Sequence, residues 1–342
     1  MKRRDLLEGL LDHAPAALLA AVGLGFGLLS PKFLTAANLG NIVVQSASTA
    51  VAAIGMTFVL LTGGVDLSVG AVMFVAAAAA GKLSRAGGSF GLAVALMLLT
   101  GLACGGLNAL LVARLRLIPF VATLGTFYAG RGFSLWLTET RAMNLPETFL
   151  QVSAARPAGV PLPIWILGAV LVVAHGILSR TPYGRQIYAV GWDAEAARKA
   201  GVPVGLVAGS VYGVSGFCAA VAALLSLGQL GAVGPKFGEN KEFVAIAAAV
   251  LGGTSLLGGR GKVFPGTLLG ALLMQSVENG LTLLNADPYL YPLVIGGIIF
   301  LAVAADGARS ALLERLSRRP IRREEEPGSP PPGKSPSPRL LL

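Results

Sequence analysis

The chain has 342 residues, of which 54% are hydrophobic and only 13% are charged, and its formal net charge is +10. Soluble domains carry about 25% charged residues, so this composition excludes an ordinary water-soluble domain and indicates a protein that lives in a lipid bilayer. The two cysteines lie in apolar segments and the two histidines are isolated, so neither residue type indicates a metal site.

Apolar segments long enough to cross a membrane recur along the chain. A spanning helix needs about 20 apolar residues to cross roughly 30 Å of hydrocarbon. The first segment follows a basic start that acidic residues dilute, which favours a retained helix over a cleaved signal peptide. The sequence therefore predicts an all-α, polytopic integral membrane protein with about ten transmembrane helices. Their expected ranges are 14–30, 41–61, 66–82, 89–112, 118–137, 162–179, 204–226, 243–257, 263–284 and 289–306.

Basic residues are distributed unevenly between the two sets of connections. Of the 27 lysines and arginines, 19 fall on the side that holds both termini and seven on the other, while Arg131 lies inside a predicted span. Basic loops remain in the cytoplasm, so both termini are predicted to be cytoplasmic. The positive charge is thus a consequence of topology and does not require a nucleic-acid partner.

The two ends of the chain differ in character. Residues 1–310 contain all the apolar segments, so we expect them to form the transmembrane domain. Residues 311–342 are basic, then acidic, then rich in proline and serine. Such a composition cannot bury a core, which predicts a disordered cytoplasmic tail.

A carboxylate follows the second apolar segment directly, in the stretch GGVDLSVG. Gly63 and Gly64 interrupt the helix, and Asp66 or Ser68 can accept the unpaired N–H groups of the next one. The alternative is a discontinuous helix that lines a translocation path, where irregular backbone faces water. A capping aspartate beside the path satisfies both interpretations.

Arg131 is the one basic residue expected deep in a span, roughly 20 Å from its start. An arginine there costs about 2.5–3.5 kcal/mol unless it meets water or a partner. Glu278 is expected at a similar depth, about 22 Å into its own span, so an Arg131–Glu278 pair is one expectation. The other is that each side chain reaches the outer headgroup region separately.

Uncharged polar side chains recur inside the predicted spans. They either bond helix to helix or line a path for a solute that has many hydroxyl groups and no net charge. Tyr128, Phe127 and Trp136 either stack on such a solute or lie at the membrane interface. The candidate path residues are Gln45, Asp66, Asn108, Thr126, Arg131, Gln275, Glu278 and Asn279.

The connection at 181–205 follows the sixth predicted span and is expected in the cytoplasm. Asp193 can cap a short helix over 194–200, which Gly201 and Pro203 end. Glu195-Ala196-Ala197 followed by Gly201 resembles the coupling loop of permease subunits of bacterial ATP-binding-cassette importers. The alternative is a capped surface helix without a partner. The residues that the resemblance assigns to coupling are Gly184, Asp193, Glu195, Ala196, Ala197, Arg198 and Gly201.

A glycine-rich stretch, LGGTSLLGGRGKVFPGTLLGALL, separates the eighth and ninth predicted spans. GGRGK is not a phosphate-binding loop, because Lys262 is followed by Val263 and not by a hydroxyl residue. We therefore expect no ATP hydrolysis by this chain, and interpret the glycines as a tight cytoplasmic turn. The residues expected at helix breaks or turns are Gly63, Gly64, Gly252, Gly253, Gly258 and Gly259.

The same stretch is similar to the ribose/xylose/arabinose branch of these permeases, as are GGVDLSVG, PFVATLGT and YGRQIYAVGWDAEAARKAGV. The resemblance covers roughly residues 35–306. It implies a multi-pass permease in the bacterial inner membrane that imports a monosaccharide and is not itself an enzyme. The implied partners are an ATPase subunit, which holds ATP and magnesium, a periplasmic sugar-binding protein, and a second permease copy of the same or another kind. No cofactor is expected in this chain.

Two alternatives remain from the sequence. One is a permease of the related importers for branched-chain amino acids or nucleosides, which Arg131 would suit if the solute carried a carboxylate. The other is a secondary transporter, but the scarcity of acidic residues inside the spans disfavours it.

Overall fold

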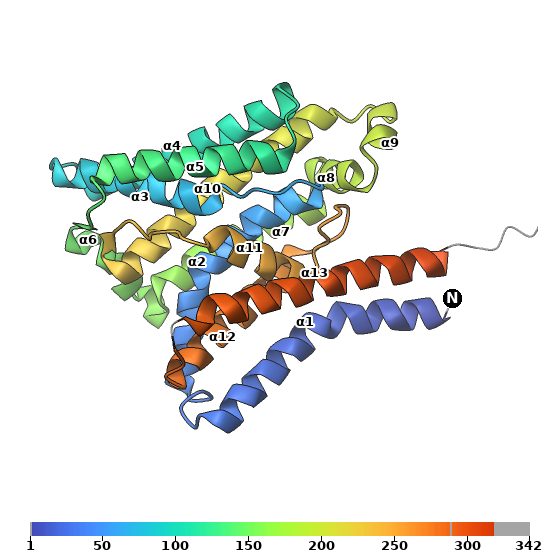
Figure 1. The fold of residues 1–342 in the computed structure, drawn as a ribbon, viewed down its shortest axis with the longest axis horizontal. Coiled ribbons are helices and arrows are strands. Elements are labelled where there is room, and N and C mark those ends of the chain that lie inside the picture. Colours follow the sequence, from blue (N-terminus) through green and yellow to red (C-terminus); the bar gives the residue numbers. More distant parts are fainter. Residues whose placement is uncertain (1, 288, 318–342) are drawn as a thin grey trace, which may run out of the picture.

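The computed structural model describes residues 2–287 and 289–317, and Figure 1 shows them as a bundle of helices. The predicted all-α fold is confirmed. Within the described residues the strands are two-residue segments, β1 (Met143–Asn144) and β2 (Ala232–Val233), which pair antiparallel. The predicted tail begins inside the last helix, which runs to Ser317, and its residues 318–342 lie outside the described residues.

A helix covers at least part of each predicted span. Four of the described helical segments are long and apolar enough to cross a membrane on their own: Ala36–Leu61, Phe90–Arg114, Leu162–Arg180 and Val204–Leu230. The figure of about ten crossings stays a prediction. In chain order the helices are α1 (Lys2–Leu29), α2 (Ala36–Leu61), α3 (Val69–Arg85), α4 (Phe90–Ala109), α5 (Pro119–Thr138), α6 (Glu147–Ala154), α7 (Leu162–Arg180), α8 (Pro182–Trp192), α9 (Ala194–Lys199), α10 (Val204–Leu230), α11 (Lys241–Leu251), α12 (Leu268–Leu283) and α13 (Leu290–Ser317).

Short π-helical turns extend two of these helices, and a 3₁₀ turn lies in the connection after α6. One π turn, Leu110–Arg114, continues α4, and the other, Val263–Thr267, precedes α12. The 3₁₀ turn is Pro157–Gly159. The α1 helix bends along its length (Figure 1) and contains Pro15, which lacks the N–H that a helix interior needs.

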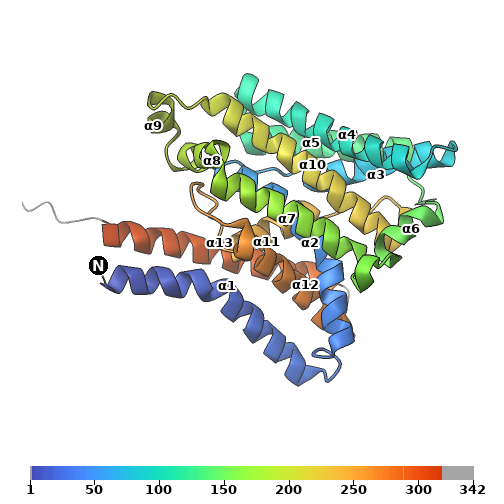
Figure 2. The ribbon, with the colours of Figure 1, turned by 180° about the vertical axis from the view of Figure 1, so that it is seen from behind.

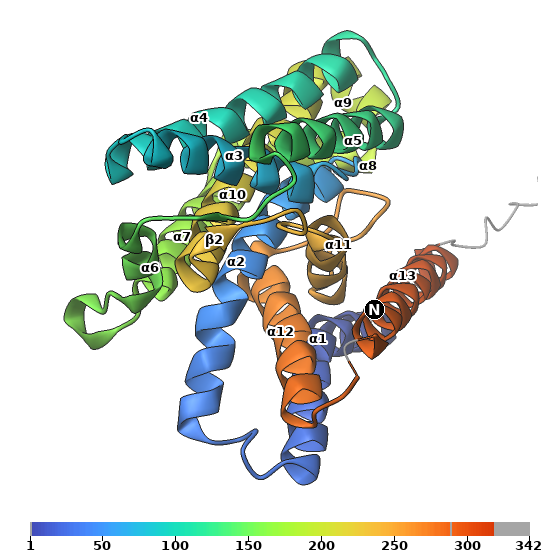
Figure 3. The ribbon, with the colours of Figure 1, turned by 60° about the vertical axis from the view of Figure 1, so that its left-hand side comes forward.

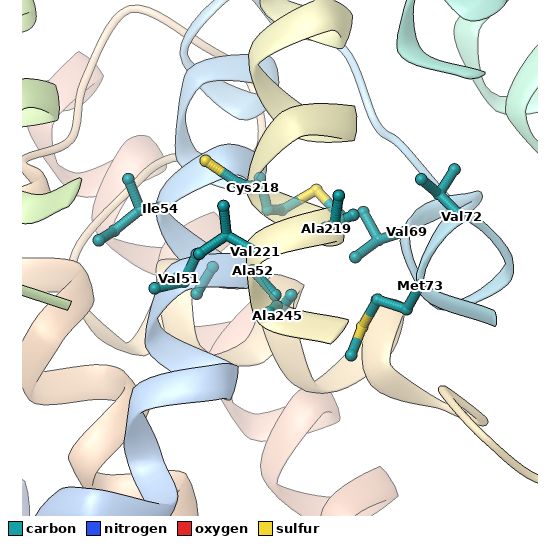
Figure 4. Packing of buried hydrophobic residues seen from close by; sticks show 14 of the residues in the cluster. Val51, Ala52, Ile54, Val69, Val72, Met73, Cys218, Ala219, Val221 and Ala245 are labelled. Carbon is teal, nitrogen blue, oxygen red and sulfur yellow. The ribbon is translucent and has the colours of Figure 1, made fainter. Parts of the chain in front are cut away.

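Helices α2 and α10 form the centre of the bundle. Figure 3 shows α2 between α3, α4 and α5 on one side and α1 and α12 on the other. Side chains of α2, α3, α10 and α11 meet in one apolar cluster, which Figure 4 shows around Val51, Met73, Ala219 and Ala245. Every residue of α2 from Ser46 to Leu61 is buried, so this part of the helix belongs to the protein core.

Glycines allow α4 and α10 to approach closely. A Cβ atom added to Gly101 would collide with the backbone carbonyl of Gly216, and one added to Gly105 would collide with that of Tyr212. Small residues at helix contacts are typical of membrane bundles, because they let backbones pack directly. This contact accounts for part of the high glycine content.

The α11 helix is shorter than the predicted span at 243–257. Its 11 residues extend about 16 Å, roughly half of the hydrocarbon thickness. An irregular segment, 234–240, precedes it, just as 62–68 precedes α3. Both α3 and α11 therefore start after a continuous but non-helical segment.

The described chain ends lie at the same end of the molecule as α8 and α9. Figures 1 and 2 show the start of α1, the end of α13 and the α8–α9 pair together, with α6 at the opposite end. This arrangement agrees with the predicted orientation, in which both termini and the 181–205 connection share one side of the membrane.

Candidate functional site

The connection at 181–205 folds into two short helices. Thr181 caps α8 by accepting a 3.1 Å hydrogen bond from the Gly184 N–H. One carboxylate oxygen of Asp193 accepts 2.9 Å bonds from the N–H groups of Glu195 and Ala196 at the start of α9. Gly201 follows α9 with φ +84°, a conformation that glycine adopts without strain. The short capped helix expected from the sequence is present, one residue shorter than predicted.

The outer face of α9 is exposed. Ala197 is buried against the bundle, whereas Glu195 and Arg198 are exposed. Lys199 forms a 3.0 Å ion pair with Glu195 on this exposed surface. Trp192, at the end of α8, is 76% exposed, which is unusual for a large aromatic side chain. The two helices thus present a charged and aromatic surface at one end of the molecule.

The inner face of α8 is fixed to the glycine-rich turn and to the end of α2. The Tyr188 hydroxyl donates a 2.8 Å bond to the carbonyl of Gly261. The Gly259 N–H donates a 2.9 Å bond to the carbonyl of Leu61, the last residue of α2. A Cβ atom on Gly191, in α8, would collide with the Leu61 carbonyl oxygen and with the Gly259 nitrogen. Three separate parts of the chain therefore meet here through their backbones.

The predicted break and turn glycines lie at such junctions. Gly63 follows α2 with φ +77°, and Gly64 lies against the Tyr212 hydroxyl. Gly252 ends α11 with its Cα against Gly266, a contact that leaves no room for a Cβ atom. The other predicted turn residues have left-handed φ angles: Gly253 (+91°), Gly258 (+89°) and Gly259 (+71°).

Asp66 lies in the irregular segment between α2 and α3 and is 1% exposed. Its Oδ1 accepts hydrogen bonds from the Ser68 N–H (2.9 Å) and the Ser68 hydroxyl (2.6 Å). Its Oδ2 accepts a 2.7 Å bond from the hydroxyl of Ser215 in α10. The carboxylate therefore stabilises the backbone that opens α3 and ties this break to α10.

Two predicted path residues extend the hydrogen bonds of Asp66. The Asn108 side-chain amide donates a 2.7 Å bond to the Ser68 hydroxyl, and the Thr126 hydroxyl donates a 2.8 Å bond to the Asn108 carbonyl oxygen. Asn108 is 1% exposed. The network joins the start of α3 to α4, α5 and α10, so in this structure these groups connect helices.

Arg131 bonds to backbone and not to a carboxylate. Its guanidinium donates 2.7 and 3.2 Å bonds to the carbonyls of Pro235 and Phe237, in the irregular segment before α11. Its Cζ atom also lies 5.3 Å from the centre of the Phe74 ring, a cation–π contact. The predicted Arg131–Glu278 pair is wrong: both residues are described, no bond joins them, and Glu278 is exposed on α12. Carbonyls outside a helix lack intrahelical donors, and the arginine supplies them.

The remaining predicted path residues lie between α2 and α12. The Gln275 amide donates a 3.2 Å bond to the Gln45 carbonyl oxygen. Asn279 and Asn38 exchange amide bonds of 2.9 and 3.0 Å. These pairs are separate from the Asp66 network, so the structure does not bring the eight candidates into one site.

A cavity of about 260 Å³ lies beside Arg131, where α5 faces the start of α11. Leu67, Phe127 and Tyr128 contribute to its wall, together with Glu239, Asn240 and Glu242. These last three polar residues were not among the site residues predicted from the sequence. Their signal was the stretch GENKEF, which places acids and an amide directly before an apolar run. Among the described residues no group of three or more metal-binding side chains is found.

Known proteins match nearly the whole membrane domain. Residues 38–303 match the family described as "Branched-chain amino acid transport system / permease component". The chain belongs to this family. It is therefore a multi-pass membrane protein, and its predicted membership of the importer permeases is confirmed.

Relatives of this permease span similar lengths. It is 37% identical to a ribose import permease protein of Haemophilus influenzae, over 82% of this chain and 88% of that protein. It is 36% identical to a D-allose transport system permease protein of Escherichia coli, over 84% and 89%. It is 35% identical to a fructose import permease protein of Rhizobium meliloti, over 88% and 87%. No solved structure matched the permease.

Proposed function

We propose that this chain is the membrane subunit of an ATP-driven importer that carries a monosaccharide across the bacterial inner membrane. The observation that carries this proposal is the identity of 35–37% to ribose, allose and fructose permeases over more than four fifths of the chain. The α8–α9 pair supports it, because a transporter driven by its own ion gradient needs no such projecting element.

The energy comes from a separate ATPase subunit, which would hold ATP and magnesium. The exposed face of α9 and the side chain of Trp192 form the docking surface for that subunit. A shift of α8 is transmitted to α2 and to the glycine-rich turn, because the Gly259–Leu61 and Tyr188–Gly261 bonds join them. Two permease copies and a periplasmic sugar-binding protein would complete the transporter, which opens alternately to the two sides.

The family description names branched-chain amino acids, which makes an amino-acid permease the second candidate. An amino acid would need a cation for its carboxylate. Arg131 already donates to the carbonyls of Pro235 and Phe237, and the cavity beside it also contains Glu239 and Glu242. Because its guanidinium is already bonded to these two carbonyls, Arg131 is not available to a carboxylate, which favours an uncharged solute.

Uptake by reconstituted vesicles tests the proposal. The complete complex, with its ATPase and binding protein, should accumulate D-ribose, D-allose or D-fructose only when ATP is present, and should not accumulate L-leucine. The matched control is the permease alone. If the permease alone concentrates sugar in response to an ion gradient, the chain is a secondary transporter and the proposal fails.

A further inference from the structure

The starts of α3 and α11 meet inside the bundle. A Cβ atom added to Gly70, in the first turn of α3, would collide with the Gly238 carbonyl and with the Glu242 carboxylate. A Cβ atom added to Gly238 would collide in turn with the Gly70 carbonyl. Each of these helices follows an irregular segment, and the two helices contact each other at their N-terminal ends. In transporters such breaks are where solutes bind, because backbone outside a helix is tolerated only beside protein or water.

Glu242 supplies a second and independent observation at this contact. Its side chain is 2% exposed, and its Oε2 accepts no hydrogen bond among the described residues. Leaving a buried carboxylate oxygen without a donor is costly. Among the described residues no ion pair within 4 Å joins Arg131 to Glu242, and the guanidinium donates instead to the carbonyls of Pro235 and Phe237. This oxygen lies against Gly70 and has almost no accessible surface, so a sugar hydroxyl would supply the missing donor only when the contact between the starts of α3 and α11 loosens.

The cavity that Glu242 lines offers the other contacts that a sugar needs. Asn240 provides an amide that both donates and accepts, and the exposed carboxylate of Glu239 is a further acceptor. Tyr128 is 68% exposed and lies at the cavity with Phe127, so aromatic rings are available to the apolar face of a sugar. A volume of about 260 Å³ is large enough for a single sugar ring.

We propose that this cavity, at the contact between the starts of α3 and α11, is a monosaccharide-binding site on the translocation path. Glu242 and Asn240 bind sugar hydroxyls, Tyr128 packs against the ring, and Arg131 holds the 234–240 segment in place. The inference rests on the proposed import function and adds to it the residues that contact the solute.

The position of α11 explains how such a site would respond to ATP. The helix carries Glu242 in its first turn and leads at its other end into the glycine-rich turn. That turn is bonded to α8 through Tyr188 and Gly261. A displacement of α8 therefore reaches the cavity through one rigid helix of 11 residues.

Protection of a cysteine from alkylation tests the site directly. Glu239→Cys places a thiol at the cavity, and Lys236→Cys places one on the same segment outside it. Both variants are made with Cys104→Ala and Cys218→Ala, which remove the two native cysteines. The complex of permease and ATPase is labelled with a maleimide, with and without about 100 mM D-ribose, D-allose or D-fructose, enough to fill a millimolar site.

At least one of these sugars should slow labelling at position 239 by about threefold or more, with no effect at 236 and no protection by L-leucine. Adding Glu242→Gln should remove the protection while labelling without sugar, and assembly with the ATPase, stay unchanged. If no sugar protects position 239 in a complex that imports one of them, the binding site is wrong and the proposed function stands. Protection that survives Glu242→Gln and Tyr128→Ala also overturns it. A complex that imports none of the sugars contradicts the proposed function. In the same sample, protection of position 239 still supports the binding site, and its absence overturns the site as well.

Discussion

The hydroxyl of Tyr188 donates a 2.8 Å hydrogen bond to the carbonyl of Gly261, which joins α8 to the glycine-rich turn. Burial raises the pKa of Tyr188, so its hydroxyl keeps its proton and remains a donor at neutral pH. The turn leads in one direction to α11 and in the other to α12. This single bond therefore connects the surface proposed to meet the ATPase with the helices that surround the proposed path.

Tyr188→Phe removes that bond and leaves the Gly261 carbonyl without its donor. The loss of about 0.5–1.5 kcal/mol is too small to unfold the bundle but enough to loosen the junction. We expect sugar uptake by the complex to fall while ATP hydrolysis continues. Tyr183→Phe is the matched control, because Tyr183 lies on the same helix and shares its 2.6 Å bond with Ser210 of α10. Equal losses in the two variants would contradict a special role for the turn.

Gly191→Val tests the same junction through its packing. The added side chain would collide with the Leu61 carbonyl and the Gly259 N–H, and would break the bond between them. We expect the variant to insert into membranes but to lose uptake, since α8 can no longer lie against α2. Gly176→Val in α7 is the control, because its Cβ position has no atom within 4 Å. Normal uptake by Gly191→Val would show that the close contact is dispensable.

The elements that the sequence predicted well are those with a local signal. Long apolar runs predicted most of the helices, and Asp193 and Gly201 predicted the two ends of α9. The short length of α11 was missed because the apolar run at 243–257 looked like a full span. Hydropathy reports the environment of a residue but not whether its backbone is helical.

The partners of Arg131 show a second limit. The sequence allowed only a comparison of depths, which suggested Glu278, because carboxylates are the obvious partners of arginine. The observed partners are the carbonyls of Pro235 and Phe237, and a backbone carbonyl becomes a candidate only where a helix is known to be broken. Glu242 was missed for the same reason.

Arg131→Lys tests these carbonyl contacts. Lysine keeps the charge but cannot place two donors in the fixed geometry of a guanidinium, so one of the two carbonyls would lose its partner. We expect a lower melting temperature of the purified permease, by a few degrees, and reduced uptake. The charge-swapped pair Arg131→Glu with Glu278→Arg should be no better than Arg131→Glu alone. If Glu278→Arg rescued the uptake or the melting temperature of Arg131→Glu, the result would support an Arg131–Glu278 pair.

Asp66 and Ser215 are expected to be energetically coupled. The Ser215 hydroxyl donates to Oδ2 of Asp66 at 2.7 Å, and both side chains are about 1% exposed. Ser215→Ala and Asp66→Asn should each destabilise the permease by about 1–3 kcal/mol, because each leaves a buried polar group poorly paired. The double variant should cost less than the two single costs together. Additive costs in thermal unfolding would show that the two groups act independently.

The face of α9 gives the most direct test of coupling. Removing Glu195–Arg198 deletes most of this exposed helix, and Gly201→Asp puts a charged side chain at φ +84°, where an L-residue is strained by about 1–2 kcal/mol. Both variants should insert into membranes yet fail to co-purify the ATPase subunit or to take up sugar. Gly205→Ala, in the first turn of α10, is the control, since the nearest atom to its Cβ position is the Ala113 carbonyl oxygen at 3.9 Å. An ATPase that still co-purifies with the deletion variant would place the docking surface elsewhere, and α9 would then be only a capped surface helix.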